Sequence, residues 1–81
     1  MRVHVDVTAD DIAKGKRTAC HECPLALAIR RVTRKRDVMV GLFSVHAGMK
    51  FGVLPHEAVT FVAGFDKEQD VRPFSFDLEL K

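Results

Sequence analysis

Two stretches of alternating apolar and polar residues, one near each end of the chain, constrain the fold most strongly. The first covers Arg2–Val7, where three valines alternate with polar side chains, and the second covers Pro73–Leu80. A period of two is typical of a strand that buries one face. Because 81 residues have room for one hydrophobic core, we expect both strands to belong to a single domain, residues 1–81.

Two helix starts follow the first strand. Thr8, with Asp10 and Asp11 in the next turn, predicts a short helix of one or two turns that Gly15 ends. Pro24 suits the first position of a longer helix, which makes Cys23 its cap and places its end near Thr33. The expected buried stripe of this second helix is Leu25, Ala28, Ile29 and Val32.

The second half of the chain predicts a β-hairpin, a helix and the last strand. One strand is expected from Asp37 to Val45 and another from Met49 to Val53, with the turn at Ala47–Gly48. A further helix starts at Leu54–Pro55. Its expected buried stripe is Ala58, Phe61, Val62 and Phe65.

These elements predict an α+β fold in βαββαβ, or ferredoxin-like, order with a short extra helix. In this arrangement two helices cover one face of a four-stranded antiparallel sheet, and the last strand lies beside the first. A permuted α+β sandwich built from the same elements fits the pattern nearly as well. The strand order therefore stays open at this point.

Hydropathy and cysteine content suggest the cellular setting. No apolar run approaches the roughly 20 residues that span a bilayer, and the alternation at the N-terminus is unlike a signal peptide. Two cysteines three positions apart are too few to stabilise a small secreted fold by disulfides. We therefore expect a cytoplasmic protein that does not act at a membrane.

The Cys20-x-x-Cys23 pair has three interpretations. In the first, the pair is half of a tetrahedral zinc site, which needs two more ligands, but His4, His46 and His56 stand singly on separate elements. In the second, it is a redox pair at a helix start, although a loop rather than a strand precedes it. The interpretation that we favour is structural: two small, reduced side chains that pack and cap a helix, with no cofactor.

Positive charge is concentrated in one part of a chain whose net charge is only +2. The segment from Lys14 to Arg36 holds eight basic residues and one acid, Glu22. Such a surface can contact an acidic protein or a nucleic-acid backbone, although a solvated helix end explains part of it. The predicted partner-binding residues are Lys14, Lys16, Arg17, Arg30, Arg31, Arg34, Lys35 and Arg36.

Signatures of catalysis are absent from the sequence. There is no Gly-rich phosphate loop, no Gly-x-Ser-x-Gly turn and no His-Glu-x-x-His motif. An RNA-binding ferredoxin-like sheet presents aromatic side chains outwards for base stacking. Here Phe51 stands in an otherwise aliphatic strand, Phe74 and Phe76 alternate as core residues, and there is no Tyr or Trp, so this function is not indicated. We expect a protein that is not an enzyme.

The chain resembles a group of short proteins from phages and mobile elements. The shared motifs are a Val-rich first strand, a Thr-x-x-Asp-Ile turn, Cys-x-x-Cys-Pro-x-Ala-Leu-Ala, Leu-Pro-x-x-Ala-x-x-Phe and Pro-Phe-x-Phe. Here these motifs are Val3–Val7, Thr8–Ile12, Cys20–Ala28, Leu54–Phe61 and Pro73–Phe76. The resemblance implies a small accessory protein that binds and blocks a host machine, as anti-CRISPR proteins do, and it supplies no catalytic residues.

Two functional hypotheses follow. In the first, a non-enzymatic inhibitor occupies a host protein or ribonucleoprotein complex, such as a CRISPR effector, through the basic surface. In the second, the chain is a small zinc- or thiol-containing regulator that binds nucleic acid, with Cys20 and Cys23 as metal ligands.

Overall fold

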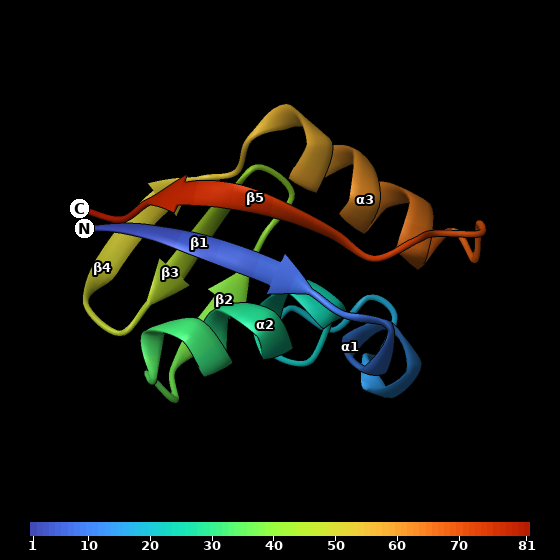
Figure 1. Ribbon diagram of the computed structural model, residues 1–81, viewed down its shortest axis with the longest axis horizontal. Coiled ribbons are helices and arrows are strands. Elements are labelled where there is room, and N and C mark those ends of the chain that lie inside the picture. Colours follow the sequence, from blue (N-terminus) through green and yellow to red (C-terminus); the bar gives the residue numbers. More distant parts are fainter.

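The computed structural model describes all 81 residues and contains five strands and three helices (Figure 1). The longest helix has 11 residues, and none of the three has the length and apolar character needed to cross a membrane. In chain order the elements are β1 (Arg2–Val7), α1 (Ala9–Lys14), α2 (Pro24–Thr33), β2 (Val38–Val40), β3 (Ser44–Ala47), β4 (Lys50–Val53), α3 (His56–Asp66) and β5 (Phe74–Glu79).

The strands form two antiparallel sheets. The terminal strands β1 and β5 pair along their whole length, from Arg2 opposite Glu79 to Val7 opposite Phe74. The second sheet has the order β2-β3-β4. The prediction that the last strand lies beside the first is therefore confirmed.

Backbone contacts just beyond β5 join the two sheets. Phe51 and Lys81 exchange both of their backbone hydrogen bonds, with N···O distances of 2.9 and 2.8 Å. The neighbouring Gly52 is buried against β5, and a Cβ atom at this position would lie 2.5 Å from the carbonyl oxygen of Glu79. Only glycine therefore allows β4 to approach β5 this closely.

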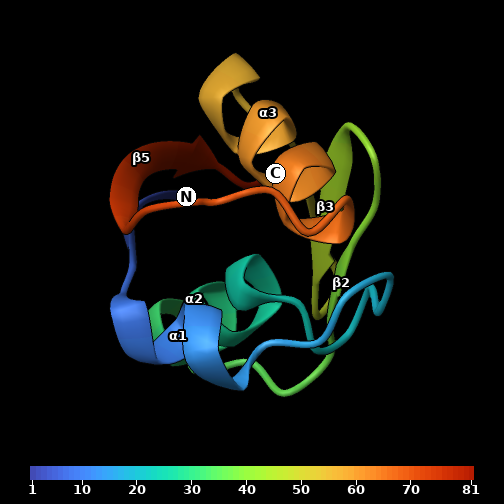
Figure 2. The same ribbon diagram turned by 90° about the vertical axis from the view of Figure 1, so that its right-hand side faces the viewer.

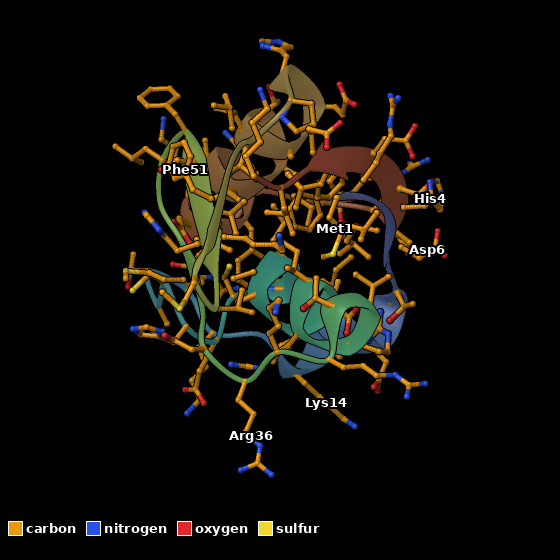
Figure 3. All side chains as sticks on the ribbon, turned by 90° about the vertical axis from the view of Figure 1, so that its left-hand side faces the viewer. Met1, His4, Asp6, Lys14, Arg36 and Phe51 are labelled. Carbon is orange, nitrogen blue, oxygen red and sulfur yellow. The ribbon has the colours of Figure 1, made fainter.

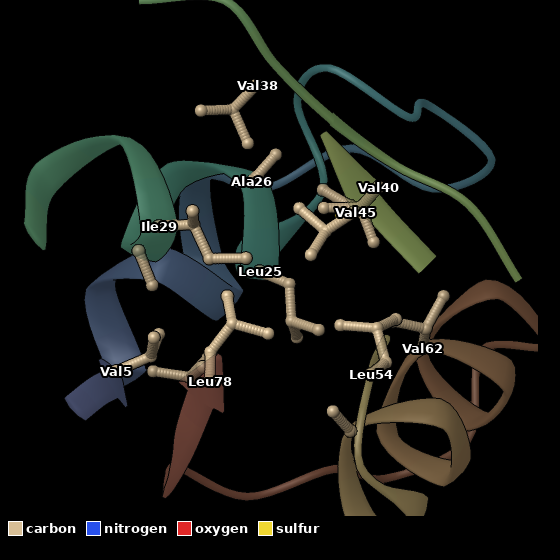
Figure 4. Close-up of a cluster of buried hydrophobic side chains, with 14 of the residues drawn as sticks. Val5, Leu25, Ala26, Ile29, Val38, Val40, Val45, Leu54, Val62 and Leu78 are labelled. Carbon is tan, nitrogen blue, oxygen red and sulfur yellow. The ribbon is translucent and has the colours of Figure 1, made fainter. Parts of the chain in front are cut away.

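Helix α2 fills the space between the two sheets. It contacts β1 from one sheet and both β2 and β3 from the other. Leu25 and Ile29 are completely buried, and valines from both sheets surround them (Figure 4). The helix α2 thus supplies the centre of the hydrophobic core.

Helix α3 lies on the opposite side of the molecule from α1 and α2 (Figure 2). A run of phenylalanine rings attaches it to β5, with ring centroids 4.8 Å apart for Phe61 and Phe74 and 5.5 Å apart for Phe74 and Phe76. Its last residue, Asp66, accepts a hydrogen bond from the backbone N–H of Thr18. The predicted stripe on this helix is buried as expected.

Both predicted starts of the first two helices are confirmed. Thr8 caps α1 through a capping box, in which its hydroxyl accepts from the Asp11 N–H and the Asp11 carboxylate accepts from the Thr8 N–H. Cys23 occupies the cap position of α2 but makes no side-chain capping bond, and Pro24 begins the helix. The cysteine therefore contributes to the helix start by packing rather than by hydrogen bonding.

The predicted four-stranded sheet in ferredoxin-like order is not confirmed. The expected strand from Asp37 to Val45 is divided into β2 and β3, because the chain turns at residues 41–43, where the N–H of Gly41 donates to the carbonyl of Ser44. The structure is an α+β fold with two sheets, and its helices α2 and α3 lie on opposite sides rather than on one face. The sequence pattern did not indicate this turn, because Leu42 and Phe43 are apolar and continue the pattern of a strand.

The predicted stripe of α2 is correct at three positions and wrong at Val32. This side chain is 40% exposed, whereas Ala26 is fully buried. The core surrounds the first two turns of α2, and the helix emerges into solvent towards its C-terminus. The last apolar position therefore has no sheet to pack against.

Replacing Ile29 by aspartate should unfold the protein. A charge at this completely buried position should cost more than about 4 kcal/mol, which is most of the stability of a domain this small. The matched control is Val32→Asp one turn later, which should cost at most about 1 kcal/mol. Urea unfolding followed by circular dichroism measures both, and an Ile29→Asp protein as stable as the control would contradict the described core.

Candidate functional site

The eight predicted partner-binding residues differ in what they contact within the fold. Lys14 pairs with Asp10 and Lys16 with Glu22, each at 3.2 Å, and all four side chains are exposed. The Arg17 guanidinium lies 5.6 Å from the centre of the Phe65 ring. Exposed pairs of this kind are worth at most about 1 kcal/mol, so they reduce the availability of these cations without removing it.

Arg31 has a structural role that the sequence did not reveal. Its guanidinium donates to both carboxylate oxygens of Asp11 and to the backbone oxygen of Asp6, each at 2.8 Å. Asp11 is only 3% exposed, and the Arg31 hydrogen bond holds the pKa of this carboxyl below its ordinary value while the pKa of Arg31 rises. Arg31 therefore fastens α2 to α1 and to the end of β1.

The four remaining cations make no ion pair within the chain. They are Arg30, Arg34, Lys35 and Arg36, which we call the basic end. Arg34 ends α2 in the left-handed conformation (φ 59°), and its N–H donates to the carbonyl of Arg30. In Figure 3, Arg36 projects away from the body of the molecule.

The position of the basic end is set by the chain on either side of it. Cations near the C-terminus of a helix are favoured by the helix dipole, and the C-terminus of α2 is the part of that helix outside the core. The side chain of Lys35 lies over Gly48 in the β3–β4 turn, because a Cβ atom there would be 3.0 Å from its Cδ. The basic end thus reaches from α2 to the hairpin.

The two cysteines line a concave site of about 230 Å³ at the edge of β2. Cys20 is exposed and Cys23 is buried, and they do not form a disulfide. Burial raises the pKa of the Cys23 thiol, and the nearby Asp66 carboxylate adds to this rise. Because the thiolate is the reactive and metal-binding form, this environment favours the structural interpretation of Cys23.

The histidines lie apart, as the sequence predicted, and each has its own surroundings. His4 Nδ1 lies 2.9 Å from Asp77 Oδ1 across the β1–β5 pair, and this hydrogen bond raises the pKa of His4 and lowers that of Asp77. His21 Nδ1 lies 3.1 Å from the carbonyl oxygen of Val38. No group of three or more His, Cys, Asp or Glu side chains is placed to hold a metal ion, so Cys20 and Cys23 gain no further ligand within the chain.

An exposed apolar surface on the β2-β3-β4 sheet is the feature that sequence reasoning missed. Met39, His46 and Phe51 stand opposite one another on the three strands, and all three are exposed. The strand residues on either side of this row point inwards or are only partly exposed. The alternation of apolar and polar residues within each short strand indicates which side chains point outwards. It could be used only once the boundary between β2 and β3 was known.

Comparison of the chain with protein-family models, with curated proteins and with solved structures finds no match. The resemblance to phage proteins thus remains a prediction from the motifs.

Removing the Arg31 side chain should destabilise the protein. Arg31→Ala leaves the buried Asp11 carboxylate without its main partner and should cost about 1–3 kcal/mol at neutral pH. Because the pKa of Asp11 is lower in the folded than in the unfolded protein, the ionised carboxylate stabilises the fold at pH values above its ordinary pKa of 3.8. This stabilisation is lost as the pH falls through the pKa of the folded state. The difference between Arg31→Ala and the wild type in urea unfolding should therefore shrink on acidification.

The matched control for this prediction is Arg36→Ala, which removes an equally charged side chain that makes no ion pair. Its stability should lie within about 0.5 kcal/mol of the wild type. Equal losses in Arg31→Ala and Arg36→Ala would show that the Asp11 contact is not stabilising.

Proposed function

We propose that this protein is a non-catalytic binding protein whose basic end contacts a negatively charged partner. The observation that carries the proposal is the clustering of four cations without an ion pair, Arg30, Arg34, Lys35 and Arg36, within seven residues. Arg31, in the same segment, is used by the fold itself. Four cations on one short segment attract an anionic surface. Binding does not require breaking an ion pair within the chain, because these cations make none.

The non-catalytic part of the proposal is supported by the surroundings of the groups that could otherwise react. The Cys23 thiol is buried and its pKa is raised. His4 is engaged between Asp77 and Asp6 on an exposed strand pair rather than beside a cleft. Neither group is arranged as an activated nucleophile or as a general base facing a bound substrate.

The partner class within this proposal is a host protein or a ribonucleoprotein complex. Inhibition of a host machine, including a CRISPR effector, is the more specific form, and it rests on the motif resemblance alone. Contact with a nucleic-acid backbone uses the same cations, because phosphates and carboxylates are both anionic. The alternative, a zinc- or thiol-dependent regulator, has no observation in its favour beyond the Cys20-x-x-Cys23 spacing.

Charge reversal at the basic end tests the proposal. The variant Arg34→Glu/Arg36→Glu changes two exposed residues that make no ion pair. In affinity capture from a bacterial lysate, analysed by mass spectrometry, it should retain at least about tenfold less of each specific partner than the wild type, because like charges in an interface cost several kcal/mol. Nuclease treatment of a parallel sample separates capture through nucleic acid from direct protein contact.

The control variant is Lys67→Glu/Arg72→Glu, which makes the same change in net charge between α3 and β5. It should capture the same partners as the wild type. Full capture by the basic-end variant, or an equal loss in both variants, would remove the assignment of the binding surface.

A further inference from the structure

The outer side of the β2-β3-β4 sheet exposes large apolar side chains that no part of the chain covers. The outward row of Met39, His46 and Phe51 crosses the three strands, and Val53 lies further along β4. Leu42 and Phe43 lie next to this surface at the β2–β3 turn, where the carbonyl of Phe43 accepts a hydrogen bond from the N–H of Leu54. Leu42 also lines the concave site that contains Cys20 and Cys23. We call these six residues the outer sheet face. Figure 3 shows Phe51 on this side of the sheet.

The exposure of these side chains is high for a chain of this size. Leu42, Phe43 and Val53 are 72%, 66% and 68% exposed, while Met39 and Phe51 are 41% and 43% exposed. Side chains of this kind present roughly 100–250 Å² each when fully exposed, so the apolar area of the face is on the order of 500 Å². The largest apolar patch on a monomeric protein is typically about 300–600 Å² and is often functional, so this face is the first candidate for an interaction surface.

We propose that the outer sheet face is a self-association surface, on which a second copy of this chain packs face to face. A standard interface buries about 800 Å² per partner, of which about 60% is apolar. The apolar area of the outer sheet face thus matches the apolar share of such an interface. The two contributing surfaces are identical, as a two-fold symmetric dimer requires.

The charge distribution also fits a second copy. None of the six residues is an acid or a Lys or Arg, whereas Glu79 and Lys81 line a concave site together with Phe51 and Val53 on the side of β4. Two faces can therefore meet with these charged side chains at the edge of the contact rather than in its middle. A partner selected by negative charge would be attracted to the basic end instead. Phe43, His46 and Phe51 carry rings, but none of the six residues is a Lys or Arg. Because sites for single-stranded nucleic acid combine stacking rings with positive charge along the backbone, this face fits an apolar protein surface better.

Electrostatics favours a two-fold axis that runs across the strands over one that runs along them. The basic end and Lys50 lie at the end of the sheet that carries the β3–β4 turn, because Lys35 covers Gly48 there. A two-fold axis running across the strands places the two basic ends at opposite ends of the dimer. When this axis runs along the row of Met39, His46 and Phe51, each of these residues meets its own counterpart, with His46 of the central strand β3 in the middle and a Phe51–Phe51 aromatic contact on β4.

Sedimentation velocity of the purified protein, from micromolar to millimolar concentration, tests this proposal. The wild type should shift from the mass of one 9.1 kDa chain to twice that mass. Val53→Lys and Leu42→Lys each place a charge in the interface and should weaken dimerisation at least about tenfold, which corresponds to about 1.4 kcal/mol. Phe43→Ser provides a further variant with no added charge, and circular dichroism confirms that each variant is folded.

Two controls separate this proposal from general effects and from the proposed function. Val32→Lys adds a charge at another exposed apolar side chain, on α2, and should dimerise like the wild type. Arg34→Glu/Arg36→Glu should also dimerise normally, so loss of partner capture and loss of dimerisation are independent results.

Three outcomes would overturn the proposal. They are a wild type that stays monomeric throughout, a dimer that tolerates Val53→Lys and Leu42→Lys, and a dimer that Val32→Lys weakens equally. Binding of oligodeoxythymidylate to the wild-type protein, abolished by Phe51→Ala, would instead identify the face as a nucleic-acid surface.

Discussion

The burial of α2 between two sheets is the interaction on which the rest of the structure depends. Leu25 and Ile29 have no exposed surface, and the strands that contact α2 belong to both sheets. In a chain of 81 residues no second core exists to compensate for its loss. The Phe51–Lys81 backbone pair and the close approach at Gly52 hold the sheets together, and the Arg31–Asp11 pair fixes α1 against α2.

Local patterns in the sequence predicted most of the elements and not their assembly. Each of the correct predictions used a pattern of only a few residues. These patterns are the alternation at both ends of the chain, the Thr8 cap and Pro24, and each predicted its strand or helix correctly. The turn at residues 41–43 was missed because Leu42 and Phe43 continue an apolar strand pattern, although in the fold both are exposed. Sheet order depends on long-range pairing such as β4 with the end of β5, which no local pattern encodes.

The candidate site shows the same division between local and long-range information. The sequence located a basic segment, but it could not distinguish Arg31, which fastens the fold, from Arg30 and Arg34 beside it. The reason is physical, because the difference lies in a contact with Asp11, 20 positions away in the chain. Asp11 was interpreted as a helix-start acid, and it is both that and the buried partner of Arg31.

The proposed function depends on four cations that lie together on one short segment, the basic end, and make no ion pair within the chain. Titration of ¹⁵N-labelled protein with polyglutamate, followed by amide chemical shifts, shows whether an anionic polymer binds there in preference to the other cations. The largest shifts are expected in residues 30–36, and added salt should reverse them. Shifts of equal size around Lys14–Arg17 and Lys67–Arg72, or none at residues 30–36, would contradict this expectation.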